Sequence, residues 1–242
     1  MLASNVLAEE VKYHNRWLAS QEAKPAKQGA VDVFDYKPIG RTDYYYNVEK
    51  PKSLIVLHHT AGWFSGDIDT LTTPHYHVSV AFVVARSGWI YRLFKPTLWS
   101  SHLGTEQNVV GGSAFNGERS IAIEISNVGQ LVKSGTDFTF VHSKYCGANE
   151  SQYFTPLPQA YRGYNTYASF TDAQYVAVGK LLDQLCPEFQ IPRTFRPVSE
   201  RYDAFPDANK ARTYKGIASH VNFRATGKTD IGPAFDWTRI GG

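Results

Sequence analysis

A short apolar run in the first quarter of the chain, Leu54-Ile55-Val56-Leu57, constrains the fold most strongly because two adjacent histidines follow it directly. A continuous run of aliphatic residues is typical of a strand that is buried on both faces. Polar residues at the point where such a strand leaves the sheet mark the usual position of sites in α/β proteins. Because side chains alternate along a strand, we expect one of His58 and His59 to enter a pocket while the other packs beneath it.

A second buried strand is predicted at residues 120–127, Ser-Ile-Ala-Ile-Glu-Ile-Ser-Asn, where Glu124 interrupts the apolar pattern. A carboxylate inside a central strand is costly to bury unless it is paired or functional. Two interpretations stay open, a structural salt bridge and a general base whose pKa is raised by burial near a metal.

Near the end of the chain, His220, Lys228 and Asp230 form the pattern H-x7-K-x-D. An imidazole nitrogen and a carboxylate oxygen both suit Zn²⁺, and the lysine between them places a cation close to whatever the metal holds. Two ligands do not make a site, so a third must come from elsewhere. The pair His58-His59 is the best candidate, whereas the pair His75-x-His77 lies in a predicted loop and is interpreted as surface histidines.

Residues 4–24 are predicted to form a helix, and residues 23–29 a linker with proline and glycine. The positions at helical spacing are Leu7, Val11, His14 and Leu18. We favour an arm that packs back on the domain over an anchor for a cell wall or a partner. The chain is therefore divided into a helical arm and linker at residues 1–48 and one domain at residues 49–242, a length that can bury a sizeable core.

The middle of the chain predicts a hairpin, a lobe and a helix. Residues 78–85 and 89–94 are predicted strands around a Ser-Gly turn. Residues 129–170 show no regular period, which predicts a lobe or lid that faces the substrate. The helix begins with the capping box Thr171-Asp172-Ala173-Gln174 and is expected to run to about Leu185, with Pro187 ending it.

Charge and cysteine content exclude several classes of protein. The net charge is only +3 and no dense basic stripe is present, which argues against a nucleic-acid partner. Cys146 and Cys186 are the only cysteines, so we exclude a disulfide scaffold and a cysteine zinc knuckle. We expect two buried thiols, with one bridge between them as the alternative.

Hydropathy gives no sign of a membrane protein, because no run approaches the ~18 apolar residues of a membrane helix. Glu9, Glu10 and Lys12 interrupt any apolar core of a signal peptide. We therefore expect synthesis in the cytoplasm without a conventional signal peptide, and we expect a monomer.

Several short motifs occur in the order that is found in one protein family. They are residues 55–62, residues 78–79 with 88–91, Trp99 with His102, residues 120–124 and residues 220–237. With them, residues 52–240 resemble the zinc-dependent N-acetylmuramoyl-L-alanine amidases, the group that includes AmpD, phage amidases and peptidoglycan recognition proteins. The resemblance implies an α/β fold in which helices flank a central mixed β-sheet, here with an N-terminal helical arm.

The resemblance also assigns roles position by position. It implies that His58, His220 and Asp230 bind Zn²⁺, that Glu124 is the acid of the strand, and that Lys228 is the lysine of the motif. Three protein ligands leave a fourth position open, as in catalytic zinc sites. The metal would lower the pKa of water toward ~7, Glu124 would take the proton and return it to the leaving amine, and Lys228 would stabilise the oxyanion.

The substrate implied by the family is the amide that joins N-acetylmuramic acid to L-alanine, in peptidoglycan or in muropeptides. Trp99, His102 and Asn127 are candidate residues for the substrate groove, with packing as the equal alternative. The chain departs from phage-type members at Val80, where they carry tyrosine, and at Ala81, where many carry histidine. Both departures place more weight on Glu124.

We expect a phage-type endolysin that acts on the bacterial cell wall, with a cytoplasmic muropeptide-recycling amidase as the alternative. Two other classes stay open. A module that binds peptidoglycan without cutting it would lack a zinc ligand, and a zinc-stabilised structural protein would need a fourth cysteine or histidine near the motif. Neither feature is found in the sequence.

Overall fold

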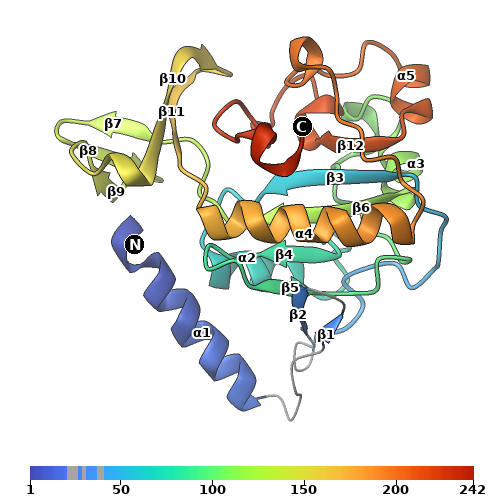
Figure 1. Ribbon diagram of the computed structural model, residues 1–242, viewed down its shortest axis with the longest axis horizontal. Coiled ribbons are helices and arrows are strands. Elements are labelled where there is room, and N and C mark those ends of the chain that lie inside the picture. Colours follow the sequence, from blue (N-terminus) through green and yellow to red (C-terminus); the bar gives the residue numbers. More distant parts are fainter. Residues whose placement is uncertain (21–26, 29–30, 37–40) are drawn as a thin grey trace.

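The computed structural model describes residues 1–20, 27–28, 31–36 and 41–242, and at its centre lies a seven-stranded mixed sheet (Figure 1). The strand order is β1-β2-β5-β4-β6-β3-β12. The strands are β1 (Lys27–Gln28), β2 (Val31–Asp35), β3 (Leu54–His59), β4 (Phe82–Val84), β5 (Ile90–Arg92), β6 (Ser120–Ile125) and β12 (Gly216–Ser219). The run β4, β6, β3 and β12 is parallel, and β5 pairs antiparallel with β4 as the predicted hairpin requires.

Strand β3 is buried on both faces, as its apolar run predicts. Ile55 and Leu57 join the main hydrophobic core, which includes residues of α4 (Asp172–Glu188), the helix that lies across the sheet in Figure 1. Leu54 and Val56 face a second cluster with residues from α5 (Ala208–Thr213) and the loops around it. Two further short helices, α2 (Phe64–Leu71) and α3 (Ser113–Glu118), complete the α/β fold expected from the sequence.

Helix α4 begins with the predicted capping box. The Thr171 hydroxyl accepts a hydrogen bond from the Gln174 backbone N–H at 3.1 Å, and the Gln174 side chain accepts one from the Thr171 N–H at 3.1 Å. The expected end near Leu185 is wrong by three residues, because Pro187 lies inside the last turn and the helix runs to Glu188.

The N-terminal helix α1 (Val6–Ser20) packs back on the domain, but its predicted inward face is wrong in part. Leu7 and Val11 are 48% and 43% exposed, whereas Glu10 is buried. Its carboxylate accepts hydrogen bonds at 2.9 Å from the backbone N–H groups of Arg86 and Ser87. The inward face therefore combines a carboxylate that has backbone partners in the domain with the buried Val6 and Trp17.

The predicted linker at residues 23–29 lies outside the described residues, apart from residues 27–28. Strand β2 pairs with β5 of the main sheet, so a strand of the predicted arm belongs to the same sheet as the domain. The division at residue 48 stays a prediction.

Residues 129–170, predicted to be irregular, contain two small sheets instead. The strands are β7 (Val132–Ser134), β8 (Asp137–Phe140), β9 (Ser143–Gly147), β10 (Phe154–Tyr161) and β11 (Tyr164–Ala168). Figure 1 shows this lobe at one end of the main sheet, with the β10–β11 hairpin projecting from it. Cys146 and Cys186 are free and buried, as expected. Among the helices that the structure describes, none combines the length and apolarity needed to cross a membrane.

Candidate active site and metal centre

Two neighbouring strands bring His58 and His220 together. Strand β12 pairs in parallel with β3 so that Ser219 lies opposite Leu57. The next residue along each segment is a histidine, His58 on β3 and His220 directly after β12, and the two side chains lie side by side. Their Nδ1 atoms are 3.0 Å apart, although 162 positions separate them in the sequence.

Asp230 completes the cluster from the loop that follows β12. Its Oδ2 lies 3.1 Å from His58 Nδ1 and 2.9 Å from His220 Nδ1. All three side chains are buried. The structure thus brings together the three residues that the sequence singled out as metal ligands, and they form a group that can hold a metal ion.

The three donor atoms fit a zinc ion. Zn²⁺ binds histidine nitrogen and carboxylate oxygen at about 2.0–2.2 Å, which sets neighbouring ligand atoms of a tetrahedron about 3.3 Å apart. The observed separations of 2.9–3.1 Å need an outward movement of only a few tenths of an ångström, on the order of what a bound ion would impose.

The charge states of the ligands also suit a divalent cation. Burial lowers the pKa of His58 to about 4, so its imidazole is neutral at neutral pH. Burial alone would raise the pKa of Asp230, but His220 and His58 beside it hold that pKa well below its usual value. A neutral imidazole and an ionised carboxylate are the forms in which these residues bind metals.

Glu124 faces the same side of the sheet as His58, because the two residues are register partners in the parallel pair of β6 and β3. Its Oε2 is buried and has no hydrogen-bond partner among the described residues. Burial raises the pKa of Glu124 well above its usual value, and the negative charge of Asp230 acts in the same direction. The described part of the chain offers it no ion pair, so the geometry favours a proton-carrying group over a structural salt bridge.

A cavity of about 450 Å³ opens beside the cluster. Glu124, Lys228, His220 and Asp230 line it. His59 also borders the cavity and packs against Gly129, where an added Cβ would lie 2.5 Å from the imidazole Cε1. The backbone at Gly129 has a φ of +77°, so both conformation and space require glycine there.

The lobe supplies lining residues that the sequence did not identify individually. Arg162 and Tyr164, at the tip of the β10–β11 hairpin, line the cavity. The Arg162 guanidinium donates hydrogen bonds to the carbonyl of Lys228 and, at 2.9 Å, to that of Arg224. These two bonds tie the hairpin to the loop that carries Lys228 and Asp230. The only signal in the sequence for these residues was the length and irregular pattern of residues 129–170.

The three predicted substrate contacts are placed differently from one another. His102 lines the cavity, but Trp99 and Asn127 do not belong to its lining. Trp99 stacks on Tyr46 with ring centroids 4.0 Å apart. The Asn127 amide donates to the carbonyl of Ala168 at 3.2 Å and its oxygen accepts from the N–H of Gly129 at 2.8 Å, so this side chain ties β6 to the lobe. Substrate contact by these residues stays a prediction, and the geometry favours packing for Trp99 and Asn127.

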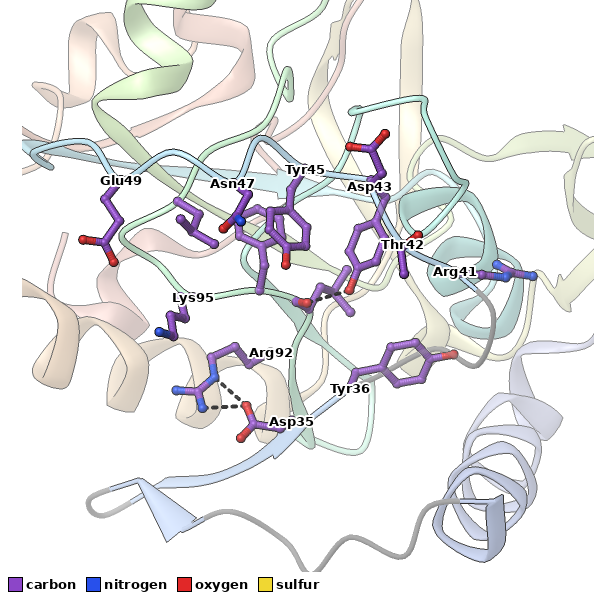
Figure 2. Close-up of a pocket in the computed structure, with 14 residues that line it drawn as sticks. Asp35, Tyr36, Arg41, Thr42, Asp43, Tyr45, Asn47, Glu49, Arg92 and Lys95 are labelled. Carbon is purple, nitrogen blue, oxygen red and sulfur yellow. Dashed lines mark hydrogen bonds and ion pairs between the residues drawn. The ribbon is translucent and has the colours of Figure 1, made fainter.

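A larger cavity, of about 650 Å³, lies beside β2 and β5 (Figure 2). Its wall includes the ion pair between Arg92 and Asp35, with the nearest nitrogen and oxygen 2.6 Å apart. The Tyr44 hydroxyl on the same wall donates to the carbonyl of Leu93 at 2.7 Å. None of the predicted site residues lines this cavity, so chemistry rather than size identifies the site.

A family model described as N-acetylmuramoyl-L-alanine amidase matches residues 48–233. That range contains all three metal-binding candidates, together with Glu124 and Lys228. A comparison with curated proteins found no match.

Several solved structures resemble the chain at low identity. AmiD from E. coli, solved with anhydro-N-acetylmuramic acid-L-Ala-D-gamma-Glu-L-Lys, is 19% identical with a TM-score of 0.49, and the match covers 89% of this chain and 63% of that one. AMPDH3 from Pseudomonas aeruginosa, in complex with anhydromuramic pentapeptide, is 17% identical with a TM-score of 0.47 and coverages of 85% and 65%. The endolysin of Thermus scotoductus bacteriophage Ph2119 is 14% identical with a TM-score of 0.39 and coverages of 84% and 91%. The chain thus spans less than two thirds of AmiD and of AMPDH3.

Proposed function

The chain belongs to the N-acetylmuramoyl-L-alanine amidase family, and we propose that it hydrolyses the amide between N-acetylmuramic acid and L-alanine with the help of Zn²⁺. The observation that carries the proposal is the convergence of His58, His220 and Asp230, whose donor atoms lie within 3.1 Å of one another. These residues would hold the ion. When bound, Zn²⁺ supplies Lewis acidity, which acidifies water and polarises a carbonyl.

Glu124 supplies the proton transfers. Its Oε2 lies buried beside the metal centre with no hydrogen bond that would compete for a proton. We assign this oxygen to accept a proton from the attacking water and to deliver it to the amide nitrogen as the C–N bond breaks. The products are the carboxyl group of the lactyl ether and the free amine of L-alanine, so one water is consumed and the proton count balances. Such general acid–base catalysis contributes about 10²–10⁴-fold.

Lys228 supplies positive charge at the same cavity. Its side chain lines the wall next to Asp230, on the loop that Arg162 holds in place. We assign its ammonium group to the negative charge that develops on the carbonyl oxygen. Removal of one such donor costs roughly 2.7–4 kcal/mol in comparable oxyanion sites.

The direct test is release of stem peptides from purified peptidoglycan. Activity should disappear when a chelator removes the metal and return with added Zn²⁺. His220→Ala should abolish both zinc binding and activity. His75→Ala is the matched control. His75 is an exposed histidine outside the cluster, and its Nδ1 lies 2.7 Å from the carboxylate of Asp43. Activity that survives thorough metal removal would contradict the proposal.

The same assay separates the remaining alternatives. A module that only binds peptidoglycan would sediment with it and release no peptide, and the complete ligand set argues against this outcome. We propose the lytic role of a phage-type endolysin, for which intact sacculi should be cleaved faster than soluble muropeptides. A preference for soluble muropeptides would instead identify a recycling enzyme.

A further inference from the structure

A chain of hydrogen bonds leads from the backbone to the metal-facing side of His58. The Ser120 hydroxyl lies 3.1 Å from the carbonyl of Gly117 and 2.6 Å from His102 Nε2. A carbonyl can only accept, so the single hydroxyl proton of Ser120 goes to Gly117. Ser120 Oγ must then accept a hydrogen bond, and His102 donates it from Nε2–H.

The direction of donation from His102 to Ser120 also determines which nitrogen of each imidazole carries the proton. A neutral imidazole carries one N–H, so His102 Nδ1 is left as an acceptor. It lies 2.9 Å from His58 Nε2, which therefore donates. The remaining nitrogen of His58, Nδ1, presents its lone pair to the space between His220 and Asp230.

The reverse direction would remove the metal site. It would place the proton on His58 Nδ1, where the N–H would donate to Asp230 Oδ2 at 3.1 Å and occupy the position of the ion. It would also take the Ser120 proton away from the Gly117 carbonyl, which would keep the backbone N–H of Arg119 as a donor. A single hydrogen bond holds His220 in the same Nε2–H tautomer, since its Nε2–H donates to the carbonyl of Leu103 at 3.0 Å.

We propose that Ser120 and His102 are positioning residues that fix His58 in the Nε2–H tautomer and hold its ring for the metal. The inference rests on the metal-binding part of the proposed function. The two residues are suited to this task because Ser120 is 2% exposed and His102, at the cavity wall, is 7% exposed, so water has little access to their bonds. The His58 and His102 rings meet edge to face at 88°, which restrains rotation of either ring. Outer partners of this kind typically change metal affinity by 10–100-fold.

The test measures Zn²⁺ affinity of the metal-free protein by competition with a chromophoric chelator, without any peptidoglycan. His102→Phe should weaken Zn²⁺ binding by about 10–100-fold, and Ser120→Ala should weaken it to a smaller extent. His102→Gln should recover part of the loss, because its amide offers one acceptor toward His58 and one donor toward Ser120. Ser100→Ala is the matched control, since Ser100 is also 2% exposed and donates to a backbone carbonyl, that of Ser79 at 2.6 Å.

Nitrogen NMR of the histidine rings gives a second readout that a purely structural role would not move. In the metal-free wild type, His58 should carry its proton on Nε2, and Ser120→Ala should shift part of the population to Nδ1. Folded His102→Phe and Ser120→Ala proteins that bind Zn²⁺ within twofold of the wild type would overturn the proposal, as would a wild-type His58 protonated on Nδ1. A wild type that binds no Zn²⁺ would refute the proposed function, and the NMR result would still decide the role of Ser120 and His102.

Discussion

Replacement of Glu124 by glutamine keeps the size of the side chain and removes its ability to carry a proton. The wild-type carboxyl lies on β6 opposite His58, with Oε2 buried and without a hydrogen-bond partner among the described residues. We expect Glu124→Gln to retain Zn²⁺ and to lower kcat by about 10²–10⁴-fold, the usual contribution of a general acid–base group. In free energy of activation this is roughly 2.7–5.4 kcal/mol at 1.36 kcal/mol per tenfold.

The same substitution should raise stability in the metal-free protein. Burial raises the folded-state pKa of Glu124 well above the ordinary 4.5. Between these two pKa values the unfolded chain releases the proton and the folded chain keeps it, so folding stability falls as pH rises. The loss reaches about 1.36 kcal/mol for each pH unit above the unfolded pKa, until the folded carboxyl also ionises. Glutamine does not titrate, and the variant therefore escapes this loss.

An activity assay and urea unfolding check this reasoning. Urea unfolding of both metal-free proteins at a series of pH values should give equal pH slopes below pH ~4 and a growing advantage for Glu124→Gln above the ordinary pKa. The metal must be removed because a nearby divalent cation favours the carboxylate. Glu118→Gln, a surface carboxylate paired with Lys50 at 3.1 Å, is the matched control and should show neither effect. Full activity of Glu124→Gln, or a stability difference that does not change with pH, would refute the reasoning.

Three further substitutions test other parts of the site and the fold. Lys228→Met should lower kcat by about 10²–10³-fold without weakening Zn²⁺ binding, and an unchanged kcat would remove Lys228 from the oxyanion role. Arg162→Met removes the two donors that hold the loop of Lys228 and Asp230. Urea unfolding should show a loss of about 1–3 kcal/mol in the free energy of unfolding, and Zn²⁺ binding should weaken. Equal stability and affinity would show that the hairpin does not hold the loop. Glu10→Gln leaves one of two backbone N–H groups without its charged acceptor and should cost about 1–3 kcal/mol by the same assay, and no loss would mean that these two bonds do not stabilise the docking of α1.

The candidate metal ligands could be predicted from the sequence because two local patterns coincide with two neighbouring strands. An apolar run places His58 at the end of β3, and the H-x7-K-x-D motif places His220 directly after β12. Parallel pairing of β12 with β3, which the sequence did not predict, brings the ends of the two strands together. The position of Glu124 follows in the same way, because its strand β6 is the other neighbour of β3.

The orientation of α1 could not be predicted from the sequence. Helical spacing predicted Leu7 and Val11 on the inner face, yet both are nearly half exposed while Glu10 is buried. Hydrophobic periodicity ranks the faces of a helix by apolar content alone. In α1 the inward face carries Glu10, which accepts hydrogen bonds from the β4–β5 turn 76 positions away along the chain, together with the buried Val6 and Trp17.

The role of His102 shows why ligands can be found by spacing while the residues behind them cannot. A zinc ligand must be one of a few side-chain types, and that requirement leaves a pattern in the sequence. The group behind a ligand needs only a hydrogen-bond acceptor at the far ring nitrogen, which for His58 is another imidazole and for His220 is the backbone carbonyl of Leu103. A carbonyl belongs to every residue, so no composition or spacing reveals it. The sequence therefore predicted His102 only as a residue of the substrate groove, with packing as the equal alternative, and in the structure both of its nitrogens lie within hydrogen-bond distance of protein atoms. The distinction has a functional consequence, because a substrate-contacting histidine would change KM, and one that fixes the tautomer of His58 changes metal affinity before any substrate is present.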